Sequence, residues 1–150
     1  MTKSGTGILS LSGTNTYTGT TTISAGTVAI SNASALGGYA AGQGTTVQSG
    51  AALSISNNIT VPEPISTSGT GVSSGGAIVF TSGNNTYSGA ITLAADSSIV
   101  SSSGAQTISG AITGAYAATI TATDNLTLSG TIGGNAPPTS LSVTTTCDTT

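Results

Sequence analysis

Apolar and polar residues alternate in short runs along almost the whole chain. In each run two aliphatic residues flank one small or polar residue, and the central residues are Ser10, Ala29, Ser54, Thr60, Thr92, Thr127 and Ser142. A period of two residues with many β-branched side chains predicts β-strands that have one buried face and one polar face. No segment has a helical period. Residues 32–42 alone leave two predictions open, a turn of helix or a lateral loop.

Pairs rich in glycine and asparagine separate these predicted strands. Ser-Gly, Ala-Gly, Gly-Gly and Asn-Asn pairs recur between the apolar runs, and they supply the positive φ angles that tight corners need. The predicted strands are shorter than the strands of about five to six residues that are typical of a β-sandwich. Short strands with frequent corners favour a solenoid, in which every corner turns the chain onto the next face of a coil.

Two segments of the sequence return later in the chain. SGTNTYTGTTTI (residues 12–23) returns as SGNNTYSGAITL (residues 82–93), which places Tyr17 and Tyr87 at equivalent positions of the two copies. ISGAITG (residues 108–114) returns as LSGTIGG (residues 128–134). Such repetition marks stacked architectures, in which one unit cannot bury its own apolar side chains. The shorter spacing, about 20 residues, predicts one coil of a β-solenoid, and the longer spacing, about 70 residues, predicts three coils.

These patterns predict an all-β fold, a parallel β-helix, over residues 1–134. Ile, Val and Leu would point inward and stack on those of the neighbouring coil. Thr and Ser would point outward, where β-branched and small polar side chains suit a pleated surface. Asparagines at the corners would stack into amide ladders. A low charge content suits this fold, since like charges on successive coils would lie only ~4.8 Å apart.

Charged residues are nearly absent, since the 150 residues include one Lys or Arg, four Asp or Glu and no His, for a net charge of −3. The abundance of Thr, Ser and Gly is also typical of disordered linkers. However, 36% of the residues are hydrophobic and the mean hydropathy is +0.28, whereas disorder couples low hydrophobicity with high net charge. We therefore expect an ordered domain. The single Lys3 cannot neutralise several phosphates, so neither nucleic-acid binding nor a polybasic membrane contact is predicted.

No apolar run approaches the ~20 residues of a membrane span. The start, MTKSGTGILS, lacks the apolar region of a signal peptide. If the protein is exported, we expect its export signal to lie outside this stretch or to be of another type. Cys147 is the only cysteine, which excludes an internal disulfide and leaves an intermolecular bond or an inert thiol.

The sequence contains little of the chemistry that catalysis needs. A β-helix that acts on acidic polysaccharides needs clustered carboxylates, or carboxylates with Arg, His or Ca²⁺, but Glu63, Asp96 and Asp124 are widely separated. The absence of His excludes a Ser-His-Asp triad, and one Cys without His excludes a zinc site. Residues 69–76 are rich in glycine but lack the lysine and the helix of a phosphate-binding loop. We predict no catalytic residue, no cofactor and no metal site, so the chain is not expected to be an enzyme.

Two further features have a structural interpretation and a functional one. Tyr17 and Tyr87 are expected to pack at corners of the coil rather than to bind a ligand. Thr16, Thr18, Thr20 and Thr22 alternate along one stretch, which leaves ice binding open as an alternative, although outward Thr is ordinary on a strand. A polysaccharide-active enzyme is the other alternative.

Residues 2–37, TKSGTGILSLSGTNTYTGTTTISAGTVAISNASALG, resemble the autotransporter-associated β-strand repeat. That repeat typically has a Lys-Thr-Gly-type start, an LTLSG strand, NTYTGGTTI and an AGTL strand, and each part has a counterpart here. Residues 82–134 resemble its more divergent continuation, and Thr20 stands where a second Gly is common. The resemblance implies a right-handed parallel β-helix outside a Gram-negative-type cell, exported by a type V pathway. It also implies a structural or transport-supporting role, because the repeat has no known catalytic residues.

The repeat pattern ends at Pro137 and Pro138, since paired prolines cannot continue a central strand. Residues 135–150 are predicted to form a tail or a further strand that pairs with another subunit. A β-helix without caps exposes strand edges at its ends, and this favours head-to-tail stacking, with Leu141, Val143 and Cys147 as candidate assembly residues. The predicted function is therefore a non-catalytic fibre unit at the cell surface or in a matrix. Its partners would be copies of itself or surface glycans, and the alternative is a monomeric spacer in an autotransporter passenger.

Overall fold

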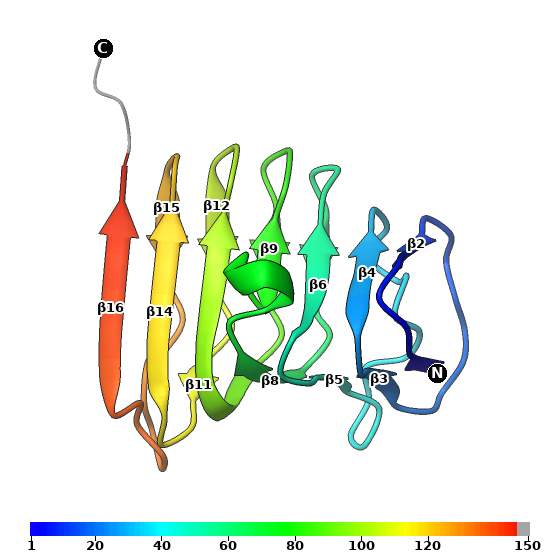
Figure 1. Cartoon of the computed structure of the whole chain (residues 1–150), viewed down its shortest axis with the longest axis horizontal. Helices are drawn as coiled ribbons and strands as arrows, with labels where there is room; N and C mark the ends of the chain where they lie inside the picture. The colour runs from blue at the N-terminus through cyan, green and yellow to red at the C-terminus, as the bar shows by residue number, and fades with distance from the viewer. Residues whose placement is uncertain (147–150) are drawn as a thin grey trace.

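The chain winds into about seven coils that stack along one axis, with their strands parallel to one another (Figure 1). The computed structural model describes residues 1–146. Within these residues the one helical element is a 3₁₀ turn, η1 (Val72–Ser74). The predicted all-β parallel β-helix is confirmed.

Each coil passes through up to three faces of the rod. The first face contains β1 (Thr2–Lys3), β3 (Thr21–Ile23), β5 (Thr45–Val47), β8 (Ile65–Gly69), the start of β11 (Ile91–Ser101) and β13 (Ile112–Thr113). The second face contains β2 (Ile8–Leu11), β4 (Gly26–Ile30), β6 (Ala51–Ile55), β9 (Ile78–Phe80), the end of β11, β14 (Ala117–Ala122) and β16 (Ser140–Thr145). The third face contains β7 (Thr60–Val61), β10 (Thr86–Tyr87), β12 (Gln106–Ile108) and β15 (Leu126–Leu128). Because β11 pairs with β8 at its start and with β9 at its end, it joins the first two faces.

The coil spacing agrees with the internal repeats. Thr21 pairs with Thr45, Thr45 with Ile65 and Ile65 with Ile91, so three successive pairings lead from the first copy of the longer repeat to the second. Ile108 pairs with Leu128, so the two copies of the shorter repeat lie on adjacent coils. Both predicted spacings, three coils and one coil, are therefore confirmed.

The core consists of inward side chains that stack from coil to coil. One ladder on the second face runs through Val28, Leu53, Ile78, Ile99 and Ile120, each at most 2% exposed. Complete burial of one such aliphatic side chain contributes about 1.5–3 kcal/mol to folding. The ladder continues to Val143 in β16, which is 43% exposed because no described residue lies beyond it.

Hydroxyl side chains form the matching ladders on the outside. Thr60, Thr86, Thr107 and Thr127 pair in register along the third face. However, Thr16, Thr18 and Thr20 lie in an irregular segment before β3. The alternating array considered for ice binding is therefore not one regular strand, since only Thr22 lies in β3, and ice binding itself stays an untested alternative.

Asparagines link successive coils at the corner between the second and third faces, although their side chains accept from backbone N–H groups rather than forming the predicted ladder of side-chain amides. The backbone N–H of Asn84 donates to Asn58 Oδ1 over 2.8 Å, and that of Ala105 donates to Asn84 Oδ1 over 3.0 Å. Asn85 and Gln106 form a second, buried amide pair, in which Asn85 Nδ2 donates to Gln106 Oε1 over 3.1 Å. These amides hold the corners of successive coils together.

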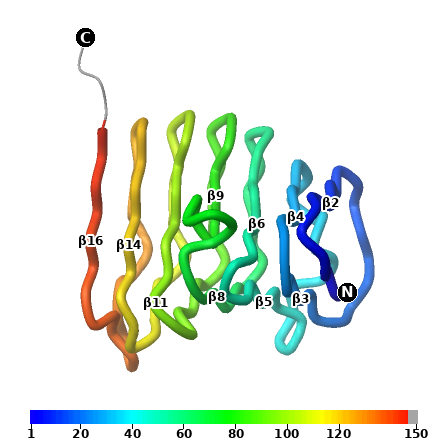
Figure 2. The backbone as a smooth tube through the Cα atoms, viewed as in Figure 1, coloured from blue at the N-terminus to red at the C-terminus, as the bar shows by residue number. Residues whose placement is uncertain are grey.

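Two segments that the sequence left open have clear conformations. Residues 32–42 form a lateral loop of turns rather than a helix. After the prolines the chain returns to the second face, where β16 pairs in register with β14 of the same chain. Figure 2 shows β16 as the last strand of the row. Its pairing with another subunit stays a prediction, and so does the domain boundary at residue 134.

Candidate functional site: the buried Glu63 corner

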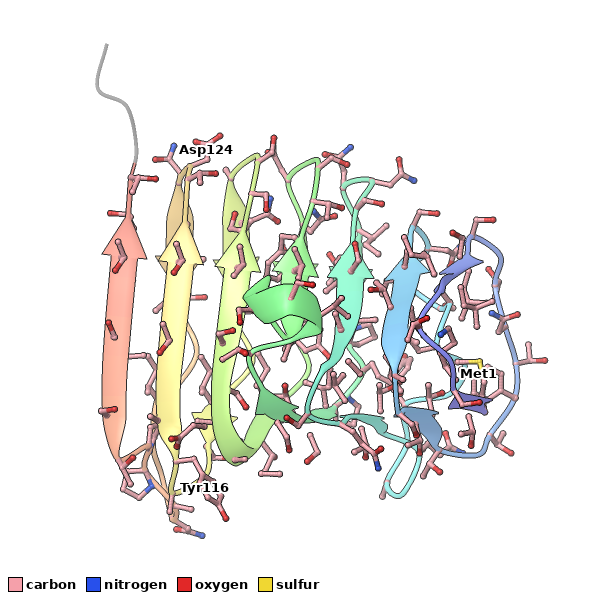
Figure 3. The ribbon with its side chains drawn as sticks, viewed as in Figure 1. Met1, Tyr116 and Asp124 are labelled. Carbon is pink, nitrogen blue, oxygen red and sulfur yellow. The ribbon has the colours of Figure 1, made fainter. Side chains whose placement is uncertain are left out.

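The three acidic residues of the described part of the chain lie at three different corners. Glu63 lies between β7 and β8, Asp96 lies at the bend of β11, and Asp124 follows β14. Figure 3 shows Asp124 and Tyr116 near opposite ends of the long strands. Within residues 1–146 no group of three or more His, Cys, Asp or Glu side chains is placed to hold a metal ion. The coil therefore does not bring the three carboxyl groups together.

Glu63 points into the solenoid. Its side chain is 2% exposed, and Thr45 Oγ1 donates to Glu63 Oε1 over 2.9 Å. Burial disfavours the charged form and raises the pKa of the Glu63 carboxyl to about 7, although the hydrogen bond from Thr45 acts in the opposite direction. By its spacing in the sequence, Glu63 is one of three isolated acids. The signal that sets it apart is Pro62-Glu63-Pro64, which stands where later coils have Ser-Gly.

The two repeat tyrosines pack near this corner, as expected. Tyr87 is completely buried, and its hydroxyl donates to the carbonyl oxygen of Glu63 over 2.8 Å. Burial, and then the charge of Glu63, raise the pKa of Tyr87 well above its usual value. The Tyr17 hydroxyl forms a hydrogen bond of 2.7 Å with Thr21 Oγ1. Burial raises the pKa of Tyr17, the hydrogen bond with Thr21 lowers it, and the charge of Glu63 raises it further.

Replacing Tyr87 by phenylalanine should reduce the free energy of unfolding by about 1–2 kcal/mol, because the buried carbonyl of Glu63 loses its donor. The measurement is urea denaturation followed by circular dichroism. Tyr17→Phe is the matched control, because the Tyr17 side chain is only partly buried. We expect a smaller loss for this variant. Equal losses would contradict a special role of the bond to Glu63.

Glycines occupy the equivalent corner position in the later coils. Gly89 lies on the coil that follows Glu63, and Gly110 and Gly130 lie on the next two coils. The three glycines therefore stack in a column that continues from Glu63. A Cβ on Gly89 would overlap the carbonyl oxygen of Glu63, and a Cβ on Gly110 would overlap that of Gly89. This close stacking explains the repeated Ser-Gly pairs of the sequence.

The outer surface of the second face has two open grooves beside the loop that contains η1, which lies over this face (Figure 1). The larger groove, of about 340 Å³, is lined by hydroxyl side chains and by Asp96, whose Oδ1 accepts a hydrogen bond of 2.9 Å from Ala117 N. The smaller groove, of about 200 Å³, is lined in part by Val72 and Val79. The larger groove offers hydrogen bonds to a polar ligand but no aromatic surface for stacking.

The candidate assembly residues lie at the last strand. Leu141 and Val143 are 42% and 43% exposed in β16, and Cys147 lies outside the described residues. At the opposite end of the rod, Ile8 in β2 is 72% exposed. The part of these residues in assembly stays a prediction.

Two segments of the chain, residues 1–30 and 72–95, match the family model of the passenger-associated-transport-repeat. They contain the two copies of the repeat found at residues 12–23 and 82–93. The resemblance to a repeat of autotransporter passengers is therefore confirmed. Comparisons with curated protein sequences and with solved structures gave no significant match. No helix of the described chain has the length and hydropathy needed to cross a membrane.

Proposed function

Because the chain carries an autotransporter passenger repeat in two segments that fold as coils of one β-helix, we propose that it is a stiff, non-catalytic spacer in an extracellular passenger. The observation that supports this proposal most directly is the continuous pairing on the second face from β2 to β16. A row of in-register strands resists bending, because bending would break many backbone hydrogen bonds at once.

The dimensions and the surface suit a spacer. Coils that are ~4.8 Å apart add up to a stacked core of roughly 30 Å for about seven coils. The outside presents hydroxyl ladders and very few charges, so the rod has little electrostatic attraction for other surfaces. The three acids of the described residues lie at separate corners, which supports a role without catalysis.

A head-to-tail fibre is the second candidate. It is favoured by the exposed apolar side chains of Leu141 and Val143 at the outer edge of β16. An unpaired strand edge with apolar side chains can accept a strand from a second molecule. In such a fibre β16 of one copy would pair with β2 of the next.

Negative-stain electron microscopy over a dilution series distinguishes the two candidates. The spacer proposal predicts short rods at every concentration. Filaments would favour the fibre instead, provided that Val143→Asp abolishes them and the matched change at the outward neighbour, Ser142→Asp, does not. Release of sugars from polysaccharides, if lost in Glu63→Gln or Asp124→Asn, would contradict the non-catalytic part of the proposal.

A further inference from the structure

The corner formed by residues 62–64, the Glu63 corner, is connected to its neighbours in an unusual way. Pro62 and Pro64 have no backbone N–H to donate, so the corner is held mainly through acceptors. Thr45 N donates to Pro64 O over 2.9 Å, and Thr45 Oγ1 donates to Glu63 Oε1. From the coil on the other side, the Tyr87 hydroxyl donates to Glu63 O. One carboxyl side chain therefore contributes to the contact between β5 and β8.

Within residues 1–146 no cationic group pairs with Glu63, and the N-terminal ammonium of Met1 donates to Thr20 O instead. The side chains near it with groups that titrate are Tyr17 and Tyr87, which are neutral at physiological pH, and Thr45 is a neutral donor. Lys3 has the only cationic side chain, and its Nζ donates to Gly5 O and Ala25 O at the corner between the first and second faces. Asp96 and Asp124 lie at other corners. An ionised Glu63 inside the coil would thus be an unpaired buried charge, which is strongly unfavourable.

We propose that the Glu63 corner is a pH-sensitive joint in the rod. The neutral carboxyl lies inside and connects this corner to Thr45. When Glu63 loses its proton, the carboxylate turns toward solvent, its bond to Thr45 breaks, and the pairing of β5 with β8 loosens. The proton passes to water or buffer, and no other bond changes. The joint concerns one corner and does not depend on whether the rod serves as a spacer.

The direction of the effect follows from the two protonation states. The pKa of Glu63 is about 7 in the folded chain, against 4.5 for the ordinary group. The folded state therefore binds the proton more tightly, and its added stability is complete below about pH 4.5 and is lost as the pH rises through about 7. Between pH 5 and 8 the local opening constant should increase on the order of a hundredfold, since each unit of pKa difference is a factor of ten.

Hydrogen exchange with mass spectrometry between pH 5 and 8, corrected for the intrinsic exchange rate, tests the joint. In the wild-type chain, protection of β5 and β8 should fall on the order of a hundredfold, whereas the β14 amides that exchange by local opening, rather than by global unfolding, should keep constant protection. Glu63→Gln should make the β5 and β8 profile flat, because glutamine is an uncharged side chain of the same shape. Asp96→Asn, a change at an exposed acid, should keep the wild-type profile. An equal loss of protection in β14, or a pH dependence that persists in Glu63→Gln, would overturn the proposal.

A second measurement needs no variant. Glu63 is the only glutamate of the chain, so ¹³C-labelled glutamate gives one side-chain carboxyl signal in the NMR spectrum. A titration midpoint near pH 7, accompanied by shifts of the Thr45 amide, is the expected result. A midpoint near the ordinary value of 4.5 would show that the carboxyl is already in water and would overturn the joint.

Discussion

Gly110→Ala is expected to lower the free energy of unfolding by about 3 kcal/mol, although it adds a single methyl group. The methyl carbon would overlap the carbonyl oxygen of Gly89 on the neighbouring coil. The two coils cannot move apart without stretching the hydrogen bonds that join them, among them the bond from Gly110 N to Tyr87 O. The measurement is equilibrium unfolding in urea, followed by circular dichroism.

Gly19→Ala is the matched control for this prediction. Gly19 is the equivalent glycine of the first repeat, but a Cβ there would have no heavy atom within 4 Å. We expect its effect to stay within about 0.5 kcal/mol, as for other changes at open surface positions. If both variants lost the same stability, the cause would be a backbone property common to corner glycines, and the stacked column would be rejected as the explanation.

Asn85→Leu is expected to cost about 3 kcal/mol, because it removes the amide but keeps the approximate volume of the side chain. Asn85 Oδ1 accepts from Ile59 N over 3.1 Å, and Asn85 Nδ2 donates to Ser82 O over 2.9 Å. Without the amide these backbone groups lose a partner, and Gln106 Oε1 loses one of its donors. Each buried polar group without a partner costs about 1–3 kcal/mol.

The neighbouring residue provides the comparison for Asn85. Asn84→Leu makes the same chemical change at an exposed position, where water replaces the lost bond to Ala105 N. We expect a loss of no more than about 1 kcal/mol for Asn84→Leu. The two variants make the same chemical change but differ in burial and in the number of side-chain hydrogen bonds that are lost, and urea denaturation compares them directly. Similar losses would mean that the buried amide pair adds nothing beyond an ordinary corner ladder.

Local chemistry explains why so much of the fold was predictable. A strand such as Gly26–Ile30 has alternating inward and outward side chains whatever its neighbours are, so a period of two residues is visible in one sequence. The Ser-Gly corners are visible for a similar reason, because Gly110 and Gly130 meet a backbone that has the same shape in every coil. The return of residues 12–23 at residues 82–93 then reveals the number of coils between the two copies.

The candidate site was much less predictable, because it depends on how coils of unequal length stack. The coil that runs from Thr46 to its partner Ser66 is shorter than the next one, which runs from Ser66 to its partner Thr92. The longer coil contains the loop with η1. Because of such an insertion, a given number of residues along the chain no longer corresponds to a fixed rotation around the coil. Sequence separation therefore does not show whether Glu63, Asp96 and Asp124 share a face.

The sequence by itself determined the class of this protein: short alternating strands, glycine and asparagine corners, a nearly uncharged surface and the passenger repeat. Each of these follows from the conformation of a few neighbouring residues or from repetition along the chain. Only the tertiary structure decided that Glu63 is buried, that the acids occupy separate corners and that β16 rejoins the second face. These facts depend on Thr45, Tyr87 and β14, which are distant in sequence, and burial is a property of the stacked coils rather than of any single segment.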